Sequence, residues 1–221
     1  MRTLLKKVLF PLLKPLAYWY LSKNRKWSYS GLRFKVFPGV FHPGLFFSTK
    51  IMMDYLSTLN LKGQSLLEIG CGSGAISLWA TRLGAKVTAV DLNPRAVENT
   101  QENALKNDLF LDVLVSDLAA NLGEEIFQLI VVNPPYYPKE PANAEELAWY
   151  CGKDFEFFSR LFEESKRHLS QEGKMFMILS EDCALEKIEA LANSAGWSMK
   201  EVHRKSVWAE MNFIFCLTLR N

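Results

Sequence analysis

The sequence has few cysteines and histidines, and none of them forms a metal-binding pattern. Its four cysteines, Cys71, Cys151, Cys183 and Cys216, lie far apart without a CxxC pair, and its three histidines are equally scattered. Zinc ribbons and disulfide frameworks need closely spaced cysteines, so the spacing excludes both classes. We therefore expect no metal ion and a reducing, cytoplasmic location.

Long apolar runs are also missing. The first 22 residues are rich in Leu, Trp and Tyr, but Pro11, Lys14 and Pro15 interrupt each apolar run before it could span a bilayer. Lys14 also breaks the apolar segment that a signal peptide needs, and no small-residue cleavage site follows. We expect neither a transmembrane helix nor a secretory signal peptide.

Acidic residues are absent from the first 53 positions, which hold ten basic residues, whereas the rest of the chain holds 16 basic and 24 acidic residues. Such a split indicates that the front of the chain meets phosphate, either of nucleic acid or of a membrane surface. We expect residues 1–36 to form a basic, apolar helical extension that packs as a lid on a domain formed by residues 37–221. Peripheral membrane contact by residues 1–25, or an RNA-contacting arm, is the alternative.

Short β-rich runs alternate with helical stretches from about Gln64 onward, which is typical of a doubly wound, mostly parallel α/β sheet. Two final strands, 199–205 and 211–220, are separated by too few residues for a crossover helix, so they predict an antiparallel hairpin at the sheet edge. The other predicted strands are 65–69, 86–90, 111–115, 128–133 and 174–179, and the predicted helices are 75–83, 94–107, 154–168 and 184–195.

The stretch LEIGCGSGA, residues 67–75, places three glycines between a predicted strand and a predicted helix. Glycines allow a sharp turn and a close approach of the backbone to a ligand. Glu68 precedes them, and Asp91 ends the next strand, where a carboxylate can accept both hydroxyls of a ribose. The spacing is GxGxG rather than the GxGxxG of dinucleotide sites, so a nucleoside ligand is indicated. The glycines are Gly70, Gly72 and Gly74.

LEIGCGSGA together with VTAVDLNP resembles the cofactor motifs of class I S-adenosylmethionine-dependent methyltransferases, from roughly Phe37 to the C-terminus. The resemblance implies a seven-stranded Rossmann-like sheet and S-adenosylmethionine as cofactor. It also implies that the glycines border the methionine part, Asp91 the ribose, and Leu92 and Asp117 the adenine. Where relatives often have an aromatic residue after that last acid, this chain has Leu118. The implied cofactor-binding residues are Glu68, Gly70, Cys71, Gly72, Ser73, Gly74, Asp91, Leu92, Asp117, Leu118 and Asn133.

The stretch VVNPPYYP, residues 131–138, follows the fourth predicted strand. Proline fixes its own φ and excludes the helical region for the residue before it, so Asn133-Pro134-Pro135 has few accessible conformations. The stretch leaves its strand beside the glycine turn, in the crevice where open α/β sheets bind ligands. We therefore expect a rigid loop that points Asn133 at the cofactor.

Asn133 suits the chemistry of an amino nitrogen conjugated to a planar group, whose delocalised lone pair makes it a poor nucleophile. The side-chain oxygen of Asn133 and the carbonyl of Pro134 could accept its two N–H bonds, aim the nitrogen and favour developing positive charge. Tyr136 could offer a flat face for stacking, and no strong general base is needed. The expected catalytic residues are Asn133, Pro134, Pro135 and Tyr136.

The NPPY motif resembles that of amino-methyltransferases acting on adenine, guanine or glutamine nitrogens. Residues 152–175 resemble the segment after NPPY in release-factor glutamine methyltransferases, the HemK/PrmC group. VFHPGLFFST, residues 40–49, is similar in position to that group's PRPET stretch and to the start of the small-domain RNA methyltransferases, with Pro43 and Thr49 matching. Thr49 is expected to contact the substrate together with Asn133 and Tyr136.

The acceptor stays open between a glutamine amide of a release-factor-like protein and an exocyclic amine of adenine or guanine in RNA or DNA. A second class of function is a non-catalytic binding module that associates with RNA or a membrane surface through the basic N-terminus. A nicotinamide oxidoreductase is disfavoured by the GxGxG spacing. The leading hypothesis is an S-adenosylmethionine-dependent N-methyltransferase.

Overall fold

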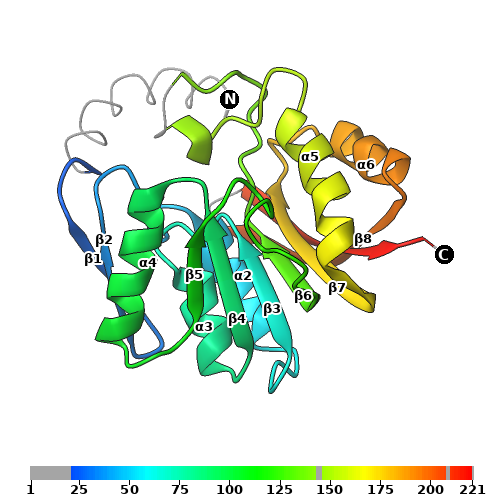
Figure 1. The fold of residues 1–221 in the computed structure, drawn as a ribbon. Coiled ribbons are helices and arrows are strands. Elements are labelled where there is room, and N and C mark those ends of the chain that lie inside the picture. The colour runs from blue at the N-terminus through cyan, green and yellow to red at the C-terminus, as the bar shows by residue number, and fades with distance from the viewer. Residues whose placement is uncertain (1–20, 143–145, 208–209, 221) are drawn as a thin grey trace.

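The computed structural model describes residues 21–142, 146–207 and 210–220, and Figure 1 shows their arrangement around one twisted sheet. Short 3₁₀ helices lie at Glu146–Ala148 and Lys166–His168. In chain order the other elements are β1 (Arg25–Tyr29), β2 (Leu32–Val36), α2 (Phe47–Leu56), β3 (Ser65–Ile69), α3 (Ala75–Arg82), β4 (Lys86–Asp91), α4 (Pro94–Lys106), β5 (Asp112–Val115), β6 (Phe127–Val132), α5 (Glu156–Ser165), β7 (Leu169–Ser180), α6 (Leu185–Ser194), β8 (Trp197–Val207) and β9 (Glu210–Leu219).

Seven strands form the main sheet in the order β5-β4-β3-β6-β7-β9-β8. The strands from β5 to β7 pair in parallel, whereas β9 runs antiparallel to both β7 and β8. This confirms the predicted doubly wound, mostly parallel sheet with a C-terminal antiparallel hairpin. The chain winds in opposite directions from β3, so the carboxyl ends of β3 and β6 border the crevice in which such sheets bind ligands.

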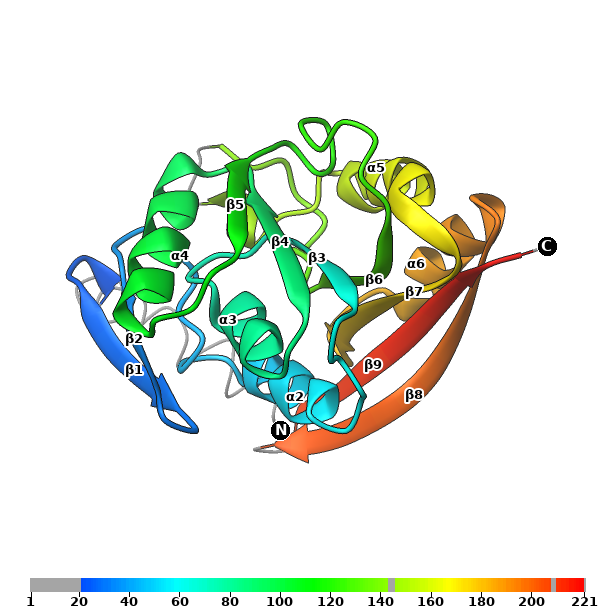
Figure 2. The same ribbon diagram turned by 60° about the horizontal axis from the view of Figure 1, so that its bottom comes forward.

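Both faces of the sheet are apolar because helices cover each of them. Leu66 and Val131 belong to a core that also contains buried residues of α2 and α3. Leu67 and Val132, their neighbours along the strands, belong to a second core with α5 and α6. Figure 2 shows these two helix pairs on opposite sides of the sheet. Helix α2, which the sequence analysis did not predict, thereby lies on the same face as α3.

Residues 25–36, expected to be helical, instead form the antiparallel hairpin β1–β2. The turn residues Ser30 and Gly31 both have positive φ, 44° and 87°, which matches the twist of a two-residue hairpin turn. Leu32 and Phe34 are buried in the core with α2 and α3, so the hairpin shares a core with the main sheet. The predictions that concern residues 1–20, a helical lid, an RNA-contacting arm or membrane contact, lie outside the described residues.

Two asparagines of α4, Asn99 and Asn103, and Asn107 directly after it fasten β2 to that helix. Asn107 accepts a hydrogen bond from the backbone N–H of Arg33 and donates one to its carbonyl, and Asn103 does the same with Lys35, all at 2.8 to 2.9 Å. Asn99 accepts from Phe37 N at 2.8 Å and donates to Lys35 O at 2.7 Å. Side chains one helical turn apart therefore satisfy alternate residues of a strand edge, much as a neighbouring strand would.

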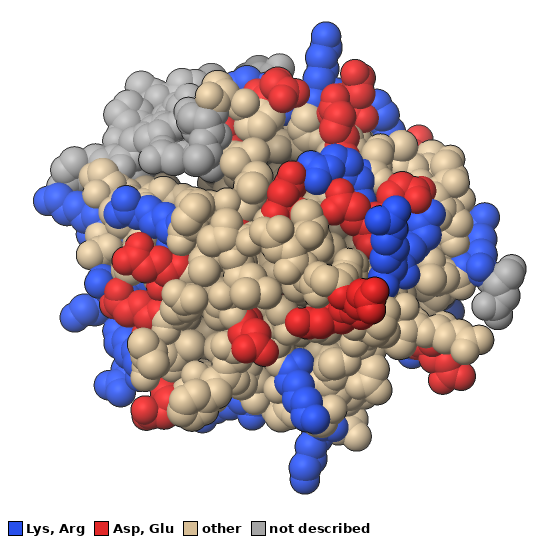
Figure 3. Space-filling view, in the orientation of Figure 1, with Lys and Arg blue, Asp and Glu red and all other residues tan. Residues whose placement is uncertain are grey.

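Two basic residues of the front segment are paired with acidic residues. Lys35 lies 2.9 Å from Glu102, and Lys50 lies 2.9 Å from Asp54, which also binds Lys205 at 3.1 Å. On the face shown in Figure 3, basic and acidic side chains are interspersed. The charge split of the sequence is therefore partly neutralised in the fold. Within the described segments, no helix is long and apolar enough to cross a membrane.

Candidate active site

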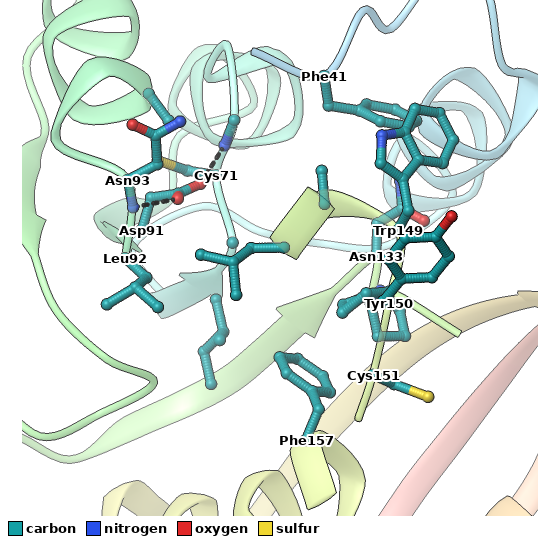
Figure 4. Close-up of a pocket in the computed structure, with 18 of the residues that line it drawn as sticks. Phe41, Cys71, Asp91, Leu92, Asn93, Asn133, Trp149, Tyr150, Cys151 and Phe157 are labelled. Atoms are coloured by element: carbon teal, nitrogen blue, oxygen red, sulfur yellow. Dashed lines mark hydrogen bonds between the residues drawn. The ribbon is translucent and has the colours of Figure 1, made fainter. Parts of the chain in front are cut away.

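A cavity of about 410 Å³ opens at the carboxyl ends of β3, β4 and β6. Figure 4 shows Asp91 and Leu92 on one side of it, and Asn133, Trp149 and Phe41 on the other. The fold therefore brings the two predicted motifs to one cavity although they are about 60 residues apart. The predicted site residues that line it are Thr49, Glu68, Gly70, Cys71, Gly72, Ser73, Asp91, Leu92, Asp117, Leu118, Asn133, Pro134, Pro135 and Tyr136.

The glycine turn adopts the left-handed backbone that makes glycine necessary, with φ of 78° at Gly70 and 56° at Gly72. A Cβ added to Gly70 would project into open space rather than into protein. Gly74 has a different role, because it caps α3 and does not line the cavity. A Cβ on Gly74 would lie only 2.7 Å from Thr100 Cγ2, so this glycine allows α3 and α4 to approach.

Asp91 ends β4 and is tied to the glycine turn. Its Oδ2 accepts from Gly72 N at 2.9 Å, and its Oδ1 accepts from Asn93 N at 2.9 Å. Burial raises the pKa of the Asp91 carboxyl, while these two N–H donors oppose the rise. Each oxygen keeps a free lone pair, so the predicted ribose contact is compatible with this geometry.

Glu68 lies at the inner end of the cavity on β3 and is only 2% exposed. Its carboxylate accepts a hydrogen bond from the hydroxyl of Ser77 in α3. Burial raises the pKa of Glu68 to about 8 against the effect of that bond, and the nearby charge of Asp91 adds to the rise. Burial also raises the pKa of the neighbouring Cys71 thiol, so this cysteine is a neutral lining group.

Three residues occupy the end of the cavity that the resemblance assigns to adenine. Leu92 is 44% exposed, whereas Leu118 is buried and has a φ of 49°. Asp117 forms an ion pair with Arg160 of α5, with Arg160 Nη2 at 3.0 Å from Asp117 Oδ2. Arg160 was not predicted, and no sequence motif marks it, because a position on α5 reaches this end only through the packing of the helix on the sheet.

Asn133 is the first residue after β6. Its Nδ2 donates to Ser48 Oγ in α2 at 3.2 Å, and no described residue donates to its Oδ1. Ser48 was missed by the sequence analysis, which instead proposed the adjacent Thr49 as a substrate contact. Thr49 also lines the cavity but is only 4% exposed. The carboxamide is therefore held on its N–H side and keeps its oxygen as an acceptor.

Tyr136 lines the cavity and packs partly against the core beneath α5 and α6. Its ring centroid lies 4.7 Å from that of Tyr137. Burial raises the pKa of the Tyr136 hydroxyl, so it stays protonated. Further aromatic residues on this side of the cavity, which the sequence analysis did not predict, are Phe41, Phe46 and Trp149.

The charges of the cavity fit S-adenosylmethionine, the cofactor implied by the resemblance. Its described lining carries five acidic residues, Glu68, Asp91, Asp117, Glu140 and Glu156, and one guanidinium, that of Arg160. An excess of acidic groups favours a positively charged ligand, and the cofactor carries a sulfonium and an ammonium group. The glycine turn provides room for its methionine part. The residues present therefore suit this cofactor.

A family model described as methyltransferase small domain matches residues 31–206. The match includes β2, the glycine turn, the NPPY stretch and most of β8. It thus covers both halves of the cavity.

The names of the curated relatives refer to different methyl acceptors. A ribosomal RNA small subunit methyltransferase C of Buchnera aphidicola is 28% identical over 170 residues, 75% of this chain and 48% of the relative. A protein of Methanocaldococcus jannaschii, provisionally named protein N5-glutamine methyltransferase, is 32% identical over 156 residues, 68% of this chain and 77% of the relative. A ribosomal protein L11 methyltransferase of Thermotoga maritima is 28% identical over 179 residues, 80% of this chain and 60% of the relative. The chain spans only about half the length of the Buchnera and Thermotoga proteins.

Solved structures share the fold. A methyltransferase from Pyrococcus furiosus has a TM-score of 0.68 at 22% identity, covering 95% of this chain and 98% of that one. A T. thermophilus 16S rRNA N2 G1207 methyltransferase, in complex with S-adenosylmethionine and guanosine, has a TM-score of 0.66 at 20% identity, covering 89% and 50%. The family match, which spans most of the chain, shows that the chain belongs to the methyltransferase small domain family.

Proposed function

We propose that the protein is an N-methyltransferase that transfers the methyl group of S-adenosylmethionine to a planar amino nitrogen. The acceptor is either the amide of a protein glutamine or the exocyclic amine of adenine or guanine in nucleic acid. The observation that carries this proposal is the position of Asn133. Its carboxamide lies in the same cavity as the glycine turn and Asp91, and Ser48 holds its N–H side. An oxygen acceptor is thereby offered to an incoming N–H bond.

The amide oxygen of Asn133 and the carbonyl oxygen of Pro134 accept the two N–H bonds of the acceptor nitrogen and direct its lone pair toward the methyl donor. S-adenosylmethionine, when bound, supplies an electrophilic methyl group. As the nitrogen becomes positive, the two oxygens stabilise that charge, and the methylated nitrogen then releases a proton to water. Tyr136 does not serve as the base, because burial raises the pKa of its hydroxyl.

The names of relatives support both acceptor classes, since one is named for ribosomal RNA and another for protein glutamine. A glutamine amide and a base amine share a flat, delocalised nitrogen with two N–H bonds. The proposed mechanism therefore serves either acceptor. Binding of a protein or a nucleic acid substrate, without a metal ion, is part of the proposal.

Product analysis tests the proposal. The purified protein is incubated with methyl-labelled S-adenosylmethionine and, separately, with RNA, single-stranded DNA, a release factor and ribosomal protein L11. Digestion and mass spectrometry then locate the label. Label on a glutamine amide or on a base amine supports the proposal, and label on carbon, on oxygen or on a lysine amine contradicts it. The alternative of a non-catalytic module predicts no labelled product in any arm.

A further inference from the structure

Three aromatic side chains from two separate loops meet on the Asn133 side of the cavity. Phe41 and Phe46 precede α2, and their ring centroids are 4.9 Å apart with planes 27° from parallel. Trp149 follows the NPPY stretch, and its ring lies 4.9 Å from Phe46 and 5.5 Å from Phe41. We call Phe41, Phe46 and Trp149 the aromatic wall.

The aromatic wall borders the place where the acceptor must lie. All three residues line the cavity and are only partly buried. In Figure 4 the rings of Phe41 and Trp149 lie together near Asn133, on the opposite side from Asp91 and Leu92. The wall thus faces the acceptor half of the cavity rather than the half assigned to the cofactor's ribose and adenine.

Backbone and side-chain contacts hold both loops in place. Trp149 O accepts from Tyr137 N at 3.0 Å, and Cys151 N donates to Tyr137 O at 3.0 Å, which ties Trp149 to the NPPY stretch. On the other loop, Trp27 of β1 packs on Gly44 so closely that an added Cβ would lie 2.6 Å from its ring. These contacts of the two loops hold the aromatic wall in position, and its three rings remain part of the cavity lining.

We propose that the acceptor is a nucleobase, which enters the cavity from an unpaired nucleic acid strand and stacks on the aromatic wall while Asn133 accepts its exocyclic N–H. This inference rests on the proposed N-methyl transfer and chooses between its two acceptor classes. A base offers a full ring face to the wall, and such stacking stabilises binding strongly. A glutamine carboxamide has only a small flat group on a flexible chain, and it would leave most of the wall uncovered.

The charges of the cavity favour entry of the base without its phosphate groups. The one cation of its described lining, Arg160, is paired with Asp117 and Glu164, so the lining offers little to a phosphate. A base that acts as substrate must leave its stack, which is easiest in single-stranded or mismatched nucleic acid. We therefore expect short unpaired oligonucleotides to be substrates, with phosphates remaining outside the cavity.

The test measures methyl transfer to single-stranded RNA, to single-stranded DNA and to a glutamine-containing release-factor peptide, with wild type and Trp149→Ala. For the nucleic acid that is modified, we expect Trp149→Ala to raise KM by about 5- to 150-fold, the range that corresponds to loss of one stacking contact. Trp149→Phe should restore most of the affinity, and S-adenosylmethionine binding measured by calorimetry should change little. Modification of RNA or of DNA identifies the source of the base.

Phe110→Ala is the matched control, because Phe110 is 88% exposed and does not line the cavity. Should Trp149→Ala fail to fold by circular dichroism, Phe41→Leu tests the same wall from the other loop. Methylation of the peptide with both nucleic acids unmodified would overturn the base assignment while leaving N-methyl transfer intact. An unchanged KM in both wall variants would also overturn it. Absence of product in every arm despite cofactor binding would overturn the proposed function itself.

Discussion

Ser48 Oγ accepts a hydrogen bond from Asn133 Nδ2 at 3.2 Å across 85 residues of sequence. The contact joins the start of α2 to the end of β6 and fixes which atom of the carboxamide remains available. With the N–H side engaged, the oxygen is left as the acceptor that an amino substrate requires. Ser48 is therefore a positioning residue in our account, acting through Asn133.

Replacing Ser48 tests this orientation. In Ser48→Ala the carboxamide loses its partner and can rotate, so we expect kcat to fall by about 2- to 12-fold, which corresponds to one hydrogen bond of about 0.5–1.5 kcal/mol. The affinity for S-adenosylmethionine should stay the same, because Ser48 does not hold the glycine turn. Steady-state kinetics and calorimetry measure the two quantities.

Thr58→Ala is a suitable control for the Ser48 variant. Its hydroxyl donates to Tyr55 O at 2.7 Å just beyond α2, outside the cavity. If Ser48→Ala lowers kcat no more than Thr58→Ala does, Ser48 does not orient the carboxamide.

Asp91 is expected to determine cofactor affinity. Asp91→Ala removes the carboxylate proposed to accept the ribose hydroxyls and also leaves Gly72 N and Asn93 N without their acceptor. We expect cofactor binding to weaken by about 1–3 kcal/mol and thermal stability to fall as well. Asp112→Ala, at an exposed position of β5, controls for loss of charge. Tight binding retained in Asp91→Ala would rule out the ribose contact.

The motifs with local geometry could be predicted from the sequence, whereas their distant partners could not. The glycine turn and Asn133-Pro134-Pro135 restrict their own backbone, so their place at strand ends follows from a few adjacent residues. Ser48, Arg160 and the aromatic wall reach the cavity only because α2, α5 and two loops pack on the sheet. Such positions have no spacing rule in a single sequence.

The sequence of the N-terminal hairpin contains a strand pattern that the helical prediction overlooked. The helical prediction for residues 1–36 relied on Leu-, Trp- and Tyr-rich composition. Within residues 25–36, however, more buried and less buried positions alternate on each side of Ser30-Gly31, the pattern of a hairpin. Packing of Leu32 and Phe34 in the core with α2 and α3 then favours strands over a helix.

Asn103 is expected to be important for stability. It is fully buried and bonds both backbone groups of Lys35 as well as Ser73 O in the glycine turn. Asn103→Ala removes the partner of Lys35 N and of Ser73 O, while Lys35 O keeps its bond from Asn99, so we expect the free energy of unfolding to fall by about 1–3 kcal/mol. Asn107→Ala, at the more exposed end of the same row, should lower the free energy of unfolding by a smaller amount. Chemical denaturation compares the two variants, and an equal loss of stability in both would contradict the greater importance given to Asn103.

The raised pKa of Glu68 predicts a pH dependence. In the folded, cofactor-free protein this carboxyl holds its proton up to about pH 8, whereas the unfolded chain releases it near 4.5. Folding therefore binds a proton between these values, and the free energy of unfolding should decrease as pH rises through about 5 to 8. Binding of the positively charged cofactor favours the ionised form, so cofactor affinity should increase over the same range.

Glu68→Gln provides the comparison, because it keeps the shape of the side chain and removes its titration. Denaturation and calorimetry at several pH values should show flatter profiles for this variant than for wild type. Identical pH profiles for the two proteins would show that Glu68 does not titrate in this range.

The most direct test of the account is the effect of Asn133→Ala on turnover and on cofactor affinity, measured on the same preparation. If Asn133 holds the acceptor nitrogen in line with the methyl group, kcat should fall to background while calorimetry shows nearly unchanged binding of S-adenosylmethionine. Turnover at the wild-type rate in the folded variant would contradict the central claim.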